Sequence, residues 1–148
     1  MSRSDTNARR RARELLVQAL YQRQLAGHDR AELLRQFRTR PGYERADTGF
    51  FDEALEAIVS QQEALEADVA AFADRPVAQL DPVERGILLL GVYELRHRPE
   101  IPFRVVINEA VDLAKRFGAE EGHKFVNAVL DRAAAELRPF DPGRRSDG

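Results

Sequence analysis

Apolar residues recur along this chain at the three- and four-residue spacing of amphipathic helices, and no segment alternates as a half-buried strand does. In the first stretch, Leu15, Leu16 and Ala19 fall on one helical face. The pattern predicts seven helices, at about residues 8–26, 29–38, 48 onward, 60–73, 81–98, 103–117 and 120–137. Short loops join them, so the sequence indicates an all-α fold, a compact seven-helix bundle.

Capping signals set the expected helix ends. Gly27 stands where a C-terminal cap belongs, and Asp29, with Glu32 three residues on, would open the second helix. Residues 60–63 have the form of a capping box that would open the fourth helix. The strongest start signal is Asp81, an N-cap acid followed by proline at the first helical position. A breaker at residues 74–76 divides the chain. We therefore expect one domain with an N-terminal half at 8–74, a C-terminal half at 75–139 and a disordered tail at 140–148.

Composition narrows the class of protein. The chain has 148 residues, a formal net charge of −2 and no cysteine, which excludes disulfides, thiolate metal sites and cysteine nucleophiles. We find no secretory signal and no apolar run long enough to span a membrane, so we expect a cytoplasmic protein. The charge is unevenly distributed along the chain. Residues 3–13 contain five arginines and one acidic residue, whereas residues 44–84 contain eleven acidic residues and two arginines. This predicts a local basic surface and a separate acidic one.

Catalytic and metal-binding motifs are weak. Glu94 with His97 and Glu120 with His123 have the Glu-x-x-His spacing of di-iron bundles, which would need two further glutamates such as Glu14 and Glu109. Both histidines lie at helix ends beside basic residues, so a chance match is the better interpretation. No phosphate-binding loop, nucleophile elbow or zinc motif occurs. We expect no enzyme, no cofactor and no metal.

The arginine cluster at residues 9–13 is the most informative feature. Cations in the first turns of a helix oppose its dipole at roughly 0.3–1 kcal/mol each, so a polyanionic ligand explains them better than folding does. RNA or DNA contact is favoured; a solvated helix start and a mitochondrial-type presequence are the alternatives. Tyr21 and Phe125 lie near basic or amide side chains and are candidates for stacking on unpaired bases, with burial in the core as the alternative.

Several segments resemble the NusB family of transcription antitermination factors over about residues 8–139. The matching stretches are 9–14 (RRRARE), 17–21 (VQALY), 107–110 (INEA), 117–120 (FGAE) and 123–131 (HKFVNAVLD). The match is specific in the first and last thirds and weak between residues 30 and 79. The resemblance implies an all-α fold of two three-helix-like halves.

The resemblance also implies a function. Such proteins bind the boxA element of ribosomal-RNA leader transcripts with the ribosomal protein NusE, and join an antitermination complex on RNA polymerase. For partner binding we look to the helix opened by Asp81, with Glu84, Leu88 and Tyr93, because its acidic neighbourhood would steer a basic ribosomal protein there. From its charge and place, Glu121 should repel phosphate beside the RNA surface. The RNA-binding residues implied are Arg9, Arg10, Arg11, Arg13, Gln18, Tyr21, Lys124, Phe125 and Asn127.

Two other functions fit a helical bundle of this kind. RNA cytosine methyltransferases carry a domain similar to the NusB family, but this chain has no room for their catalytic part and no cysteine. A protein–protein module without an RNA role would show the same helix pattern.

Overall fold

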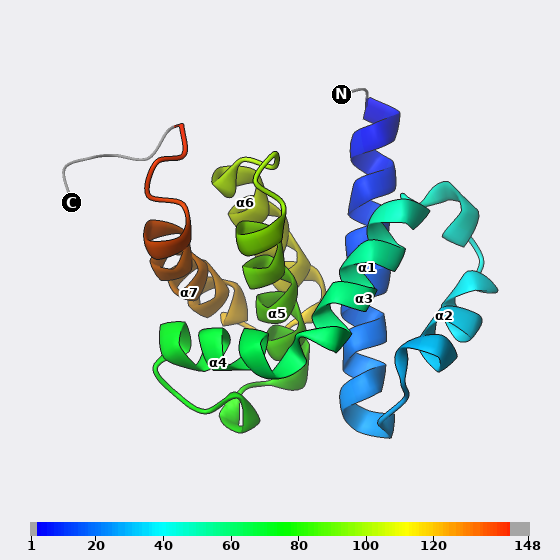
Figure 1. Cartoon of the computed structure of the whole chain (residues 1–148), viewed down its shortest axis with the longest axis horizontal. Helices are drawn as coiled ribbons and strands as arrows, with labels where there is room; N and C mark the ends of the chain where they lie inside the picture. Colours follow the sequence, from blue (N-terminus) through cyan, green and yellow to red (C-terminus); the bar gives the residue numbers. More distant parts are fainter. Residues whose placement is uncertain (1–2, 143–148) are drawn as a thin grey trace. The chain divides into compact units, whose positions relative to one another are not determined.

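The computed structural model describes residues 3–142, and in this range the chain forms seven α-helices and no strand (Figure 1). The all-α, seven-helix prediction is confirmed. None of the helices in the described range has the length and apolar character needed to cross a membrane. The helices are α1 (Arg3–Ala26), α2 (Arg30–Arg38), α3 (Thr48–Ser60), α4 (Gln62–Ala73), α5 (Pro82–His97), α6 (Phe103–Phe117) and α7 (Gly122–Leu137).

The chain divides into two compact units, and the first, Met1–Gln62, contains α1, α2 and α3. All three helices pack on one another. Their core is mostly aliphatic and includes an aromatic cluster: the rings of Phe37 and Phe51 stack with centroids 5.9 Å apart, and the half-buried Tyr43 meets Phe51 edge-on at 5.7 Å. Asp29 caps α2 by accepting the Glu32 amide at 2.9 Å, as the sequence predicts.

The second unit, Glu63–Gly148, is built around α5. Residues 86–95 of this helix are buried on every side, because α6 and α7 both pack against it. Gly91 permits the close approach of α7, since a Cβ at this position would lie 2.9 Å from the Cδ1 atom of Leu130. Asp81 caps α5 through the amides of Val83 and Glu84, at 2.9 and 3.1 Å, which confirms the predicted start signal.

Helix α4 belongs almost entirely to the second unit, because polar contacts hold it there. Arg96 binds Asp68 through Nε at 2.6 Å and Nη2 at 3.0 Å, and Arg85 forms an ion pair with Glu66. The division therefore falls between residues 62 and 63, earlier than the predicted boundary at 74/75. The breaker at residues 74–76 ends α4 without separating it from the helices that follow.

Three helix ends differ from the sequence prediction. Helix α1 begins at Arg3 rather than near Ala8, with Asp5 in its first turn. The capping box at residues 60–63 does not form, because Ser60 ends α3 and donates its hydroxyl to the Ala57 carbonyl at 3.2 Å. Helix α7 begins at Gly122, since Glu121 has a left-handed backbone with φ 68°. Most of the tail predicted to be disordered, 143–148, lies outside the described residues.

Candidate nucleic-acid interface

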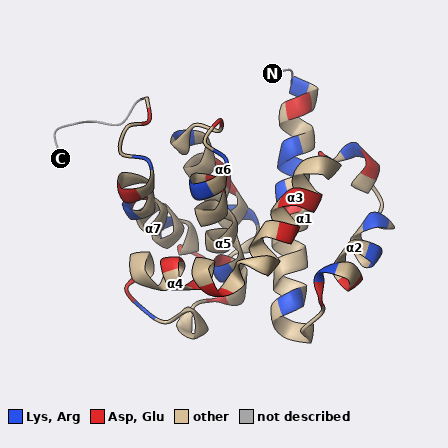
Figure 2. Ribbon diagram, in the orientation of Figure 1, with Lys and Arg blue, Asp and Glu red and all other residues tan. Residues whose placement is uncertain are grey.

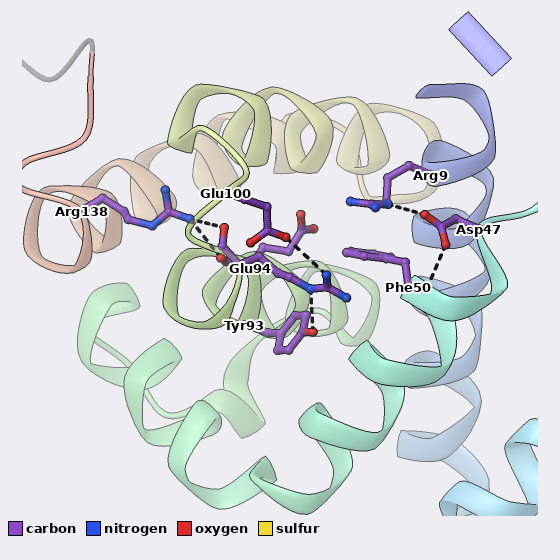
Figure 3. Close-up of polar contacts among 8 residues, drawn as sticks. Arg9, Asp47, Phe50, Tyr93, Glu94, Glu100 and Arg138 are labelled. Atoms are coloured by element: carbon purple, nitrogen blue, oxygen red, sulfur yellow. Dashed lines mark hydrogen bonds and ion pairs between the residues drawn. The ribbon is translucent and has the colours of Figure 1, made fainter. Parts of the chain in front are cut away.

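Arg9 forms the best-defined polar contact of the arginine cluster. Its Nε donates to Asp47 Oδ2 at 2.9 Å, and its guanidinium lies 4.3 Å from the centroid of the Phe50 ring (Figure 3). Asp47 is also the N-cap of α3, where it accepts the Phe50 amide at 3.0 Å. Arg9 therefore ties α1 to the start of α3, which is a structural role within the first unit.

Arg13 follows Arg9 by one helical turn and faces the same ring. It is 4% exposed, and its guanidinium lies 5.4 Å from the Phe50 centroid. A side chain this deeply buried offers little surface to a phosphate. Two of the four arginines, the half-buried Arg9 and the buried Arg13, thus pack against Phe50, and the sequence pattern does not distinguish them from Arg10 and Arg11.

Arg10 and Arg11 are exposed residues of α1, whose N-terminal half shows several blue segments and a red one in Figure 2. Arg11 lies along the loop after α2: a Cβ at Gly42 would be 3.2 Å from its Nη2 atom. Gly42 has φ 85°, a conformation that favours glycine. Within the predicted cluster, Arg10 and Arg11 are the arginines that a nucleic acid reaches most readily, because both residues are exposed, whereas Arg9 is half-buried and Arg13 is buried.

Tyr21 and Gln18 continue the outer side of α1 toward its C-terminus. Tyr21 is 38% exposed, and it lies eleven residues after Arg10, which places both on one helical face about 16 Å apart. Gln18 is half-buried and accepts a hydrogen bond from Arg40 Nη1 at 2.7 Å. Arg10, rather than Arg13, therefore shares an exposed face with Tyr21. A cation and a ring on one face suit a single-stranded nucleic acid.

In the second unit, the remaining predicted RNA-binding residues lie in the first turns of α7. Lys124 and Asn127 are exposed, and Phe125 is half-buried. The Lys124 ammonium pairs with Glu121 Oε2 at 2.6 Å, so the acid partly neutralises the nearest cation. The guanidinium of Arg75 lies 4.9 Å from the Phe125 ring centroid. Phe125 is thus neither a core residue nor a free ring.

Sequence reasoning missed two arginines that contact predicted site residues. Arg75 lies on the loop after α4, in a segment whose sequence predicts only a helix breaker. Arg40 holds Gln18 and stacks on Phe37, with its guanidinium 3.9 Å from the ring centroid. For Arg75 a signal existed: it is one of two basic residues in an acidic stretch of 41 residues, from 44 to 84.

The predicted partner-binding residues lie on α5 and are buried. Leu88 has no exposed surface, Tyr93 is 4% exposed and Glu84 is 8% exposed. The Tyr93 hydroxyl accepts a hydrogen bond from Arg98 Nε at 3.2 Å, also drawn in Figure 3. Burial raises the pKa of the Glu84 carboxyl, and Asp81 adds to the effect. These three side chains therefore pack below the surface around α5 and offer a partner little area to contact directly.

A di-iron site would need clustered carboxylates and histidines. Over residues 3–142, no three histidine, aspartate or glutamate side chains gather closely enough to hold a metal ion. Glu94, the glutamate of the first Glu-x-x-His pair, is buried within the second unit, with 2% of its surface exposed.

Comparison with known proteins identifies the family. The family model described as the NusB family matches residues 10–135. This chain belongs to the NusB family. It is 51% identical to the transcription antitermination protein NusB of Paraburkholderia phymatum, covering 89% of this chain and 91% of that protein. For the protein of the same name from Nitrosomonas eutropha the identity is 47%, covering 91% and 81%.

A solved structure of a NusB protein also resembles this chain. The chain matches T. maritima NusB with a TM-score of 0.75 and 29% identity, covering 86% of this chain and 90% of that one. The resemblance noted in the sequence is therefore confirmed. NusB family proteins are transcription antitermination factors and not enzymes, which places this chain in transcription regulation.

Proposed function

We propose that this NusB family member binds the boxA element of ribosomal-RNA leader transcripts together with the ribosomal protein NusE, and joins the antitermination complex on RNA polymerase. The observation that carries the proposal is the outer face of α1, where Arg10 and Tyr21 are exposed. Arginines supply attraction to phosphate and set the register, while an exposed ring stacks on an unpaired base. A protein that acts on nascent transcripts needs both.

Different members of the predicted set have different roles in this proposal. Arg10 and Arg11 contact phosphates, and Tyr21 stacks on a base, with Gln18 beside it. Arg9 and Arg13 fix α1 against Phe50 of α3, where their guanidinium groups already lie.

On the second unit, the start of α7 makes its own RNA contacts. Lys124 and Asn127 are exposed there, and they supply a cation and an amide. Phe125 presents one face to a base while Arg75 occupies another part of the ring. Glu121 weakens the local attraction, because it neutralises Lys124 and repels phosphate.

We propose that NusE binds around α5, whose neighbourhood in the sequence is acidic and would attract a basic ribosomal protein. Glu84, Leu88 and Tyr93 support this surface from the interior, since they have little exposed area themselves. Replacing Leu88 would then weaken NusE binding only through loss of packing.

The test is fluorescence anisotropy with a boxA-type single-stranded RNA and a scrambled control, with and without NusE, at several salt concentrations. The wild-type protein should prefer boxA, and NusE should tighten binding. Arg10→Ala and Arg11→Ala should each weaken binding and lower the salt slope by about 0.7 for a lost phosphate contact. Tyr21→Ala should reduce affinity about fivefold or more, because a stacked base contributes about 1–3 kcal/mol.

Arg35→Ala is the matched control. Arg35 is an exposed arginine on α2 of the same unit, paired with Glu32, so its loss changes the net charge equally. It should leave both affinity and slope close to wild type. If Arg10→Ala and Arg35→Ala behave alike, the α1 face is ordinary charged surface. If the protein never distinguishes boxA from scrambled RNA, even with NusE, the RNA part of the proposal is wrong.

A further inference from the structure

Glu84 is a buried acidic residue near the start of α5, and its carboxylate does not cap that helix. It is the third residue of α5, where a glutamate commonly reaches back to its own N-cap. Here its carboxylate instead accepts a hydrogen bond from the backbone amide of Ala119, in the loop between α6 and α7. It is 8% exposed. The acid thus stabilises a loop that is distant in the sequence.

The loop is shaped around this carboxylate. Gly122, the first residue of α7, is buried, and a Cβ there would lie 2.8 Å from the carboxyl carbon of Glu84. Real Cβ atoms essentially never come so near another heavy atom, so any other residue at position 122 would force the Glu84 carboxylate to move. The Gly122 amide donates to the Ala119 carbonyl at 2.9 Å, which closes a tight turn just above the acid.

Helix α7 lacks the usual means of fixing its own start. Its N-cap, Glu121, makes no side-chain cap hydrogen bond and has a left-handed backbone that is uncommon for a residue with a Cβ. The first turn, which carries Lys124 and Phe125, therefore depends on contacts from outside the helix. Glu84 supplies such a contact from α5.

We infer that Glu84 is a positioning residue for RNA binding: its buried carboxylate holds the 118–122 loop so that the first turn of α7 presents Lys124 and Phe125 to RNA. The inference rests on the proposed function. Stacking and ion-pair geometry tolerate displacements of only about half an ångström, so loosening this loop weakens contacts that Glu84 does not itself make. Glu84 touches no RNA in this arrangement.

The negative charge of Glu84 allows the two explanations to be distinguished, because they predict opposite effects of its removal on RNA affinity. If Glu84 acted on RNA only as a negative charge, its removal would reduce phosphate repulsion and tighten binding. If it positions the loop, Glu84→Ala should weaken binding, on the order of tenfold, the scale of a lost stacking contact. Glu84→Gln keeps an oxygen that can accept the Ala119 amide, so it should restore affinity to near or above wild type.

The experiment measures boxA-type RNA affinity by anisotropy for Glu84→Ala, Glu84→Gln and the control Asp112→Ala, all in the full chain. Asp112 is an exposed acid on α6 of the same unit, so its loss removes the same charge without changing Glu84 or the N-cap of α5. It should not weaken binding. Amide NMR shifts for residues 118–125 should move in Glu84→Ala and stay near wild type in Glu84→Gln.

A second pair of variants separates the possible failures. In a Phe125→Ala background, Glu84→Ala should weaken binding little further, because both changes act on the same contact. Gly122→Ala, which adds a Cβ against the carboxylate, should also weaken binding, and it serves if Glu84→Ala does not fold. The inference is overturned if Phe125→Ala weakens binding while Glu84→Ala and Gly122→Ala do not. If the Phe125, Arg10 and Tyr21 alanine variants all bind as wild type, the proposed function has failed as well.

Discussion

Arg138 holds the C-terminal end of α5, and truncating it tests how far the second unit depends on one buried cation. The residue is 6% exposed, and each of its five N–H donors has a partner. The Leu95 carbonyl would normally accept from residue 99, which is a proline without an N–H, so Arg138 replaces that donor. The partners, some drawn in Figure 3, are the carbonyl oxygens of Leu95, Ile101, Glu94 and Arg98, at 2.7, 3.0, 3.2 and 2.8 Å, and the Asp141 carboxylate at 2.5 Å.

Arg138→Ala removes all of these donors at once. Breaking a buried charged network by deleting one partner costs about 3–5 kcal/mol, because carbonyls and a carboxylate lose the cation that compensated for their burial. Arg138→Lys retains the charge but has three donors without the planar fork, so we expect a smaller loss of about 1–3 kcal/mol.

Urea denaturation followed by far-UV circular dichroism measures the effect, as a lower midpoint at an unchanged m-value. Arg132→Ala is the control on the same helix: its Nε donates to one carbonyl, that of Phe72, at 2.8 Å on an exposed residue. It should cost about 0.5–1.5 kcal/mol. If Arg138→Ala costs no more than Arg132→Ala, the hydrogen bonds to α5 are not what stabilises this end of the unit.

Three further changes test the packing and electrostatics of the two units, each by the same denaturation. Gly91→Ala should cost about 1–3 kcal/mol, because the added Cβ meets the Leu130 side chain at 2.9 Å in a filled core; Leu130→Val in the same chain should recover part of the loss. Gly42→Ala should destabilise by about 1 kcal/mol or more through its left-handed backbone, and should also displace the Arg11 guanidinium. The folded-state pKa of Glu84 is raised, chiefly by burial, so its stabilising contribution is present below pH 4.5 and is lost as the pH rises through the folded pKa. Glu84→Gln should therefore gain stability relative to wild type between pH 4 and pH 7, and an unchanged difference would contradict the assigned burial.

The sequence predicted the helices well because their signals are local. Asp29 and Asp81 each cap a helix whose apolar spacing is regular, and both caps form as expected. The capping box at Ser60 failed for a related reason: α3 continues through this serine, so the hydroxyl faces back into its own helix instead of opening the next. A pattern of four residues does not show which of two adjoining helices will use it.

The candidate site was harder to predict because tertiary packing decides which charged side chains reach solvent. Helical spacing alone gives no reason for Arg13 to be buried over Phe50, a ring that lies on another helix. Glu84 looked like surface acid on an acidic stretch, yet it is buried below a loop that comes 35 residues later, at Ala119. Contacts of this kind depend on pairs of segments, and periodicity describes one segment at a time.

The arginine cluster of α1 thus combines two functions that its sequence cannot separate. A cation near a helix N-terminus is unfavourable by roughly 0.3–1 kcal/mol, but Arg9 offsets this by pairing with Asp47 and stacking on Phe50. Arg10 and Arg11 instead point outward. Arg9 and Arg13 fix the helix against α3, and Arg10 and Arg11 carry charge on exposed residues. Losing Arg9 should therefore lower the denaturation midpoint, because its contacts with Asp47 and Phe50 are lost, whereas losing Arg10 should lower RNA affinity.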